Sequence, residues 1–539
     1  MELTVANVLL AFVALLAVEV VSVIFHMRER YRLRAFPGPK PAPLLGNLPE
    51  LRRKTNFIAY ADWAKQYGPQ FRIFLGHQPV VVLADPELVR EVGIKKFKAF
   101  HDRSIAPLNP EGGKQKLAGD AGILPSRGAY WTTLRAAMQP LFHTSSLVSY
   151  DPIMNQALDT LLANLEAPAA SGEPVDMWNQ LGRMTMQVLG TAAFGVPFNT
   201  QVAVGEEDSE LVKASNAVFT MGFARLRTMV MLTLPRALWP LGSLLTSKLG
   251  GQQGRKIRQA SITVWRTSSA LVQNARKRAA EEGEVIAAAQ EDWKWWDEST
   301  AHAFKDVMPA RNSIIDMMMR AKDKLTGAGL TDRQIAANCN TLILAGHETT
   351  ANTLTFTIFL VARHPDVERK LLAEIDAFGD RQPGLEDLDK HFPYAEAVIK
   401  ESMRMYPAVV QTGRTAEEDS MVGGRLIPKG TWVHFAIYSI HHNPAYWPQP
   451  AVFRPERFLC QAECANRHPN AFLPFGLGPR MCIGWRMADQ EARIALIRLY
   501  QRFVFRLQPE ALKTVPELRV GITLSFKDGL PVTVVPRNR

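Results

Sequence analysis

A glycine-rich loop near the C-terminus carries a single cysteine. The loop reads Phe475-Gly476-Leu477-Gly478-Pro479-Arg480-Met481-Cys482-Ile483-Gly484. A helical pattern begins directly after it, and a helix N-terminus lowers the pKa of a nearby thiol and stabilises its thiolate. Arg480 adds a positive charge two residues before the sulfur, and Gly478 and Gly484 let the backbone approach a flat, bulky group. These are the features that a thiolate ligand of a haem iron requires.

Two other interpretations of Cys482 stay open on these residues. A lone cysteine is more commonly a small buried hydrophobe than a ligand. It is also the nucleophile of some hydrolases, although the sequence identifies no partner histidine. The pattern F-x-x-G-x-R-x-C-x-G is far more constrained than a bare cysteine, and it favours the haem interpretation.

A second candidate lies in the middle of a long helical pattern. Thr331 and Gln334 match a capping box, and apolar residues recur at helical spacing until His364-Pro365 stops the helix. The middle reads Ala345-Gly346-His347-Glu348-Thr349-Thr350. Glycine inside a helix costs about 1 kcal/mol relative to alanine. A compensating role for Gly346, such as close passage of the helix over a ligand, is therefore expected.

The polar residues of this segment have an ordinary interpretation as well. A threonine hydroxyl that bonds back to the preceding turn opens the helix locally, which suits a ligand groove. On these residues alone, however, a packing role for Thr349 and a solvated carboxylate at Glu348 are favoured.

Two pairs of residues at helical spacing are weak evidence of a functional site by themselves. Glu401 and Arg404 face one way at i, i+3, and such surface pairs contribute only a few tenths of a kcal/mol. Trp131 and Arg135, four residues apart, either bring an indole N–H and a guanidinium to one anion or form a cation–π pair.

Together these segments resemble the cytochrome P450 family over nearly the whole chain. Phe475, Gly478, Arg480, Cys482 and Gly484 match the haem-ligand signature of that family at every position. The resemblance implies a mainly α fold with a small β component. It also implies haem b (iron protoporphyrin IX) as the cofactor, with Cys482 as the axial ligand of the iron.

The resemblance also assigns roles around the haem. Ala345 and Gly346 would form the oxygen-binding groove, Thr349 would hold the water that delivers a proton, and Glu348 would relay protons from solvent. Glu401, Arg404 and Arg457 would form a buried scaffold network. The haem propionates would be held by Trp131, Arg135, Arg414 and Arg480.

The activity that the resemblance implies is monooxygenation of an apolar substrate with electrons from NADPH. The sequence carries no Rossmann fingerprint or flavin motif, so the electrons would come from a separate NADPH–cytochrome P450 reductase, with cytochrome b5 as a further partner. The alternatives are an isomerase or dehydratase on the same scaffold, of the thromboxane-synthase type, and a non-catalytic haem-binding module. Glu348 and Thr349 argue against both.

Some segments resemble the plant carlactone oxidases of strigolactone synthesis. They are Arg90–Lys98 with Asp102-Arg103-Ser104, Leu426–Val433, and Arg467–Phe472. We expect this chain to depart from that subfamily at Tyr406–Gln411 and at 279–311. The expected substrate class is an apolar, isoprenoid or apocarotenoid molecule that enters from the lipid bilayer.

The first 27 residues are expected to anchor the protein in a membrane. Leu3–Phe25 holds one charge, Glu19, and is long enough to span a hydrocarbon core of about 30 Å as a helix; a buried core helix is the alternative. Residues 28–54 hold eight basic and two acidic side chains around closely spaced prolines. A basic collar with a stiff hinge after the apolar segment predicts a single-pass endoplasmic-reticulum protein with a cytosolic body.

Composition places the rest of the chain in one large globular domain. The 539 residues are 47% hydrophobic and 21% charged, with four cysteines, which excludes disorder and a disulfide-rich module and favours a reducing compartment. Residues 55–539 are expected to form the catalytic domain, with 279–311 as a surface insertion and 229–241 as a core segment or a shallow membrane contact. The net charge of +11 comes with no nucleic-acid motif, so anionic lipid or an acidic protein fits better.

Overall fold

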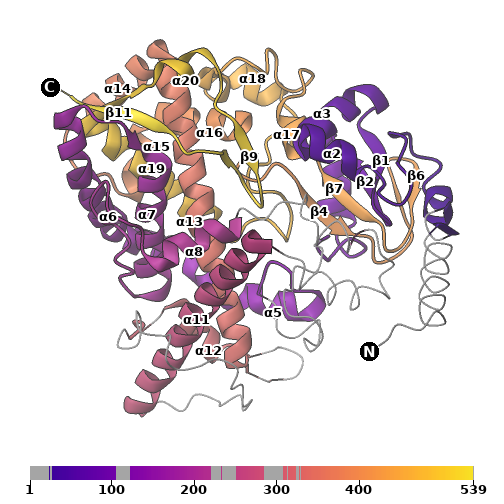
Figure 1. Ribbon diagram of the computed structural model, residues 1–539, viewed down its shortest axis with the longest axis horizontal. Helices are drawn as coiled ribbons and strands as arrows, with labels where there is room; N and C mark the ends of the chain where they lie inside the picture. The colour runs from indigo at the N-terminus through magenta and orange to yellow at the C-terminus, as the bar shows by residue number, and fades with distance from the viewer. Residues whose placement is uncertain are drawn as a thin grey trace, which may run out of the picture.

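The computed structural model describes residues 23–24, 27–104, 122–219, 232, 251–283, 308–311, 313–322, 327 and 329–537. Helices dominate these residues, and small sheets lie at the edges of the helical body (Figure 1). The α-helices are α2 Leu48–Lys54, α3 Asn56–Tyr67, α4 Pro86–Arg90, α5 Gly128–Met138, α6 Thr144–Ser171, α7 Met177–Leu189, α8 Glu210–Phe219, α11 Gly251–Glu281, α12 Ile314–Arg320, α13 Asp332–Arg363, α14 Pro365–Phe378, α15 Leu385–His391, α16 Pro393–Met405, α17 Ile437–His441, α18 Gln461–Asn466, α19 Trp485–Arg502 and α20 Pro509–Lys513.

The largest sheet joins residues 70–83 to residues 412–435. Among the described residues it has four strands in the order β1-β2-β7-β4. Strands β2 and β7 pair in parallel although they lie far apart in the sequence. A three-stranded sheet (β3-β11-β8) and the hairpins β9–β10 and β5–β6 complete the described strands. The bounds are β1 Gln70–Leu75, β2 Gln78–Leu83, β3 Val175–Asp176, β4 Thr412–Thr415, β5 Ser420–Val422, β6 Arg425–Ile427, β7 Trp432–Phe435, β8 Phe503–Leu507, β9 Leu518–Val520, β10 Leu524–Phe526 and β11 Pro531–Pro536.

Helix α13 runs through the middle of the molecule (Figure 1). The predicted capping box is confirmed, since Thr331 Oγ1 accepts from the Gln334 amide and Gln334 Oε1 accepts from the Thr331 amide. The helix ends at Arg363, directly before His364-Pro365, as the sequence predicts. Its C-terminal half is buried on nearly every side, and the hydroxyls of Thr353, Thr355 and Thr357 donate to carbonyls one turn back.

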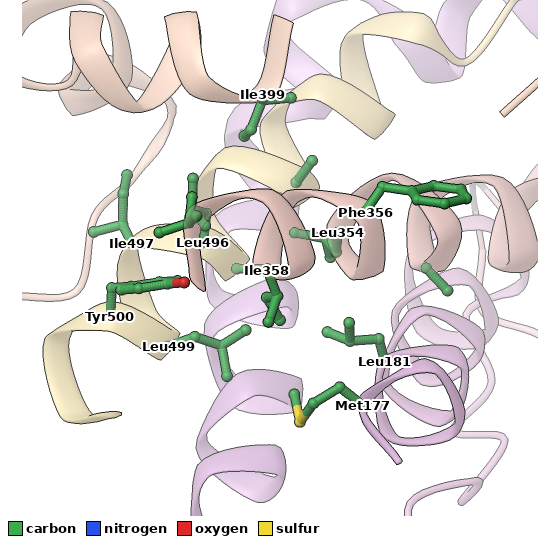
Figure 2. Packing of buried hydrophobic residues seen from close by; sticks show 14 of the residues in the cluster. Met177, Leu181, Leu354, Phe356, Ile358, Ile399, Leu496, Ile497, Leu499 and Tyr500 are labelled. Atoms are coloured by element: carbon green, nitrogen blue, oxygen red, sulfur yellow. The ribbon is translucent and has the colours of Figure 1, made fainter. Parts of the chain in front are cut away.

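The main hydrophobic core surrounds that half of α13. Leu354, Phe356 and Ile358 lie between side chains of α7, α16 and α19 (Figure 2). The labelled neighbours are Met177, Leu181, Ile399, Leu496, Ile497, Leu499 and Tyr500. Burial of apolar surface at about 25 cal/mol per Å² makes this core the main support of α13, in whose middle the candidate polar residues lie.

The proline-rich segment is docked on the sheet instead of forming a free spacer. Leu33 and Phe36 are buried, the carbonyl of Pro37 accepts from the Arg72 amide, and Gly46 bridges to Leu75 of β1. The prolines stop a helix, as expected, but apolar residues between them bind the segment to the body. Residues 33–46 of the predicted stiff hinge are therefore packed on the body.

Three sequence predictions fall largely outside the described residues. These are the membrane anchor at 1–27, of which 23–24 and 27 are described, the 229–241 segment, of which 232 is described, and the middle of the 279–311 insertion, residues 284–307. Within the described ranges, no helix combines the length and the apolar character that crossing a bilayer requires.

Candidate functional site

The cysteine loop is a tight turn held by its own backbone. The Cys482 amide donates to the Phe475 carbonyl (3.0 Å) and the Met481 amide to the Gly478 carbonyl (2.9 Å), directly before α19 begins. Gly478 has a φ of +69°, and a Cβ there would lie 2.2 Å from the carbonyl oxygen of Gly93. Gly478 therefore makes room for a neighbouring backbone, not for the flat ligand that the sequence indicated.

This geometry predicts an unequal cost for two alanine substitutions in the loop. Gly476→Ala is expected to lose about 1–2 kcal/mol, because its φ of +75° is left-handed while no atom lies within 4 Å of the added Cβ. Gly478→Ala combines the same strain with the Gly93 clash, and overpacking adds about 1–3 kcal/mol. Urea unfolding of both variants measures the difference, and equal losses would contradict the contact with Gly93.

The Cys482 thiol is deep in the protein yet has open surface. Its side chain is exposed by area, while burial raises the pKa of the thiol, against the lowering effects of the Gly484 amide, Arg103 and Arg135. The expected net lowering of the pKa by the helix terminus is therefore wrong for the free thiol, since desolvation outweighs it. The cations that act on the sulfur are Arg103 and Arg135, not Arg480.

Ala345 has open side-chain surface in the middle of α13. It is exposed although it lies between buried Ile343 and His347. Ile483, next to Cys482, packs against the hydrophobic cluster to which Ile343 belongs. Cys482 and Ala345 thus both have accessible surface next to residues of one cluster.

A group of buried arginines lies beside the cysteine loop. Arg414 is 1% exposed, and burial together with the nearby charges of Arg103 and Arg480 lowers its pKa well below the usual value. Burial likewise lowers the pKa of Arg103 to about 10 and that of Arg480 to about 9. Arginine stays protonated in proteins, so these are buried cations in need of an anion.

Too few acceptors surround these cations. Arg480 donates to the carboxylate of Asp102 (3.1 Å) and to the carbonyl of His101 (3.0 Å). Nε of Arg103, Nε of Arg414 and Nη1 of Arg480 are buried without a hydrogen-bond partner in the described part of the chain. The unmatched donors fit a ligand that carries two carboxylates, as haem does.

The predicted tryptophan–arginine pair borders the same cluster. The Arg480 guanidinium lies 4.0 Å from the centre of the Trp131 ring, closer than that of Arg135 at 6.0 Å. Arg135 instead donates to the Met481 carbonyl (2.7 Å), next to the cysteine. The structure thus brings all four sequence-predicted donors, Trp131, Arg135, Arg414 and Arg480, to one side of the loop.

Arg103 belongs to this group and the sequence analysis did not identify it as a site residue. It donates to the Arg480 carbonyl (2.7 Å), and its segment lies along β4 because the Thr415 amide donates to the Asp102 carbonyl (2.7 Å). The contact joins residues more than 300 positions apart, so no local pattern marks it. The only signal was its place in Asp102-Arg103-Ser104, a segment quoted for its resemblance alone.

Glu348 and Thr349 point to different surroundings. Thr349 is partly exposed, and its hydroxyl donates to the Ala345 carbonyl one turn back (2.9 Å), as the sequence predicts. Glu348 is 1% exposed and accepts from the Thr523 hydroxyl (3.0 Å), so its interpretation as a solvated carboxylate is wrong. Burial raises the pKa of Glu348 to about 7, against the lowering effects of Arg519, Thr523 and Asn352.

The Glu401 pair is buried and has a third member. Glu401, Arg404 and Arg457 are each 0% exposed. The Arg404 guanidinium donates to both Glu401 oxygens (2.8 Å each), and Arg457 Nε donates to Oε1 (2.9 Å). The small stabilisation that is typical of a surface pair therefore does not apply to Glu401 and Arg404. The network joins α16 to the turn at Pro455–Phe458.

The tight loop carries a deep thiol, and guanidinium groups with unmatched buried donors lie beside it. These features fit a haem-thiolate protein. The chain belongs to the cytochrome P450 family, whose sequence model matches residues 36–527. Haem is the cofactor of that family. Thus the fold and the family agree on a P450 enzyme with an iron-haem group.

Named relatives fall into two groups. Thromboxane-A synthase of Rattus norvegicus is 30% identical over 516 residues, covering 94% of this chain and 93% of that protein. Thromboxane-A synthase of Sus scrofa is 31% identical over 507 residues, covering 93% and 91%. Cytochrome P450 3A5 of Homo sapiens is 29% identical over 482 residues, covering 88% and 86%.

Proposed function

We propose that this protein is a haem-thiolate monooxygenase that oxidises an apolar substrate, with Cys482 as the axial ligand. The observation that carries the proposal is a buried carboxyl, Glu348, whose pKa burial raises to about 7 and which directly precedes the partly exposed Thr349. A general acid works best when its pKa lies near the working pH. An isomerase on the same scaffold has no need of an external proton supply.

The chain's own residues supply binding and proton delivery. Buried arginines with Trp131 would hold the two carboxylates of the haem, while Phe475, Gly478 and Gly484 shape the loop around Cys482. When bound, thiolate-ligated haem activates dioxygen, because the thiolate donates electron density that favours cleavage of the O–O bond. Ala345 would leave space beside the helix. The expectation that Gly346 makes room for a ligand is wrong, because a Cβ there would lie 2.9 Å from the Leu189 side chain of α7. Thr349 would hold a water there, and Glu348 would replenish its proton.

The proposal includes partners and location. Electrons would come from NADPH through NADPH–cytochrome P450 reductase, with cytochrome b5 as a further donor, and the protein would sit in the endoplasmic-reticulum membrane by one N-terminal span. The eight basic side chains of residues 28–54 support attachment to an anionic membrane surface. The resemblance of Arg90–Lys98 to the carlactone oxidases supports an isoprenoid or apocarotenoid substrate.

Turnover in a reconstituted membrane separates monooxygenase from isomerase. The full chain and a reductase in lipid vesicles, offered carlactone and a panel of terpenoids, should form oxygenated products only when NADPH and dioxygen are both present. Label from ¹⁸O₂ should appear in the product. Product that forms at the same rate without NADPH would replace the proposal by the isomerase, which the thromboxane-A synthase relatives favour.

Thr349→Ala is expected to uncouple NADPH consumption from product. Without the hydroxyl, no side chain at this position holds the water that the proton passes through, and general acid catalysis typically contributes about 10²–10⁴-fold. We expect NADPH to be consumed at a similar rate while product per NADPH falls at least about tenfold. The matched control is Thr353→Ala, one turn further on, whose hydroxyl makes the same bond back to the Thr349 carbonyl (2.9 Å). Unchanged coupling in Thr349→Ala would remove Thr349 from the proton path.

A further inference from the structure

Glu348 belongs to a chain of buried hydrogen bonds that joins three elements. Trp178 of α7 donates its indole N–H to Asn352 Oδ1 on α13 (2.6 Å). The Asn352 amide donates to Thr523 Oγ1 (3.3 Å), and Thr523 donates to Glu348 Oε1 (3.0 Å). Thr523 lies in the turn between β9 and β10. The C-terminal hairpin is therefore part of the surroundings of a carboxyl that lies more than 170 positions earlier.

Arg519 of β9 is the charged member of this network. Its Nη2 lies 3.5 Å from Glu348 Oε1 and its Nε donates to Ser525 Oγ on β10 (3.2 Å). The guanidinium also lies 5.6 Å from the centre of the Trp178 ring. Its side chain is 24% exposed while that of Glu348 is 1% exposed. Arg519 thus lies between the buried carboxyl and solvent.

The second oxygen of the Glu348 carboxyl is available for proton transfer. Glu348 Oε2 is buried without a hydrogen-bond partner among the described residues. Thr349, one residue on, points about 100° away around the helix and donates to the Ala345 carbonyl. Transfer from Glu348 toward Thr349 therefore needs a bridging water or a turn of the Glu348 side chain, and Arg519 holds the side chain on the hairpin side.

We propose that Arg519 is a positioning residue that sets the charge state of Glu348, and that the β9–β10 hairpin is the route by which protons reach this carboxyl from solvent. The proposal rests on the monooxygenase function and adds the path by which protons for that reaction arrive from solvent. In each cycle the neutral carboxyl releases one proton through water toward Thr349 and becomes a carboxylate. One proton from solvent at Arg519 then restores it, so the protein itself gains and loses nothing.

Among the charged groups around Glu348, Arg519 has the main effect on the pKa of the carboxyl. Thr523, Asn352 and Trp178 are neutral. His347 on the same helix is buried, and burial lowers its pKa to about 4, so it is neutral at pH 7. Burial raises the pKa of Glu348 and the cation lowers it. Removal of the cation should therefore raise the pKa further and keep the carboxyl protonated to higher pH.

Infrared titration of the haem-loaded full chain tests this without turnover. The wild type should show a protonated-carboxyl band with a midpoint near pH 7, and Glu348→Gln should remove it. Arg519→Gln should move the midpoint upward by about one pKa unit or more, which is tenfold in the protonation equilibrium. The control Lys527→Gln removes one cation from the segment after the same hairpin, where Lys527 pairs with exposed Glu517 (2.8 Å), and should leave the midpoint in place.

A second variant and a second readout separate the possible outcomes. Arg519→Lys keeps the charge and should keep the midpoint close to that of the wild type. Arg519→Met also removes the charge, and it replaces Arg519→Gln if that variant fails to fold. In turnover, the pH profile of coupling should move upward with the infrared midpoint in Arg519→Gln. An unmoved midpoint, or the lack of a Glu348 band, overturns the proposal. Absence of NADPH-dependent product with the expected infrared shifts would instead reject the monooxygenase function alone.

Discussion

Replacement of Cys482 by alanine is expected to abolish the long-wavelength absorption band that the reduced, carbon-monoxide-bound protein should show. That band is typical of haem with an axial thiolate, and Cys482 is the thiol of the loop that matches the haem-ligand signature. The methyl group of alanine offers no donor to iron. The measurement is the difference spectrum of the purified full chain, with haem content determined separately.

Other substitutions make this test specific for the sulfur. Cys464→Ala removes an exposed thiol on α18, whose Sγ contacts the Phe458 carbonyl (3.4 Å), and should leave the band unchanged. Cys339→Ala removes a buried thiol on α13 and should lower stability without changing the band. A retained band in Cys482→Ala would refute the ligand assignment, whatever the haem content.

The proposed iron ligand, Cys482, does not compete with a metal-binding cluster in the described part of the chain. No group of three or more histidine, cysteine, aspartate or glutamate side chains there could hold a metal ion. A single thiolate is enough for haem because the porphyrin supplies the other ligands in its plane. The raised pKa of the free thiol fits this role, since bonding to a metal deprotonates a coordinating thiol outright.

Local signals predicted the bounds of the elements that carry the site. The capping box at Thr331 and the stop at Pro365 depend on neighbours a few residues away, so the bounds of α13 could be read directly. Strands β2 and β7 lie far apart in the sequence. Their parallel pairing depends on the whole fold, and no local pattern indicates it.

Burial and long-range contact were the features that sequence could not supply. Spacing placed Glu401 and Arg404 on one helix face but could not tell a surface pair from a network without solvent contact. Glu348 looked like a solvated carboxylate because the residues that enclose it, Thr523 and Arg519, lie on a hairpin far along the chain. Arg103 reaches the haem side through a sheet contact, not through a motif.

Glu401→Gln is expected to destabilise the protein by about 3–5 kcal/mol, because it leaves two fully buried guanidinium groups without their shared counter-charge. Arg404 and Arg457 have no solvent contact to compensate the loss. Such a cost is a large part of the roughly 5–15 kcal/mol by which domains are stable. The variant should therefore unfold at much lower urea concentration and should retain less haem after purification.

The matched control removes one carboxylate from a neighbouring but exposed pair. Glu463→Gln breaks the ion pair with Arg454 (2.7 Å), whose side chains are 38% and 30% exposed, and surface pairs are worth about 0–1 kcal/mol. Arg454 donates its own backbone amide to Glu401 Oε1 (3.1 Å), so the two variants probe adjacent parts of one turn. Because only the Glu401 network is fully buried, Glu401→Gln should lower the free energy of unfolding several times more than Glu463→Gln. Equal losses would show that the buried network holds its geometry without needing the charge on Glu401.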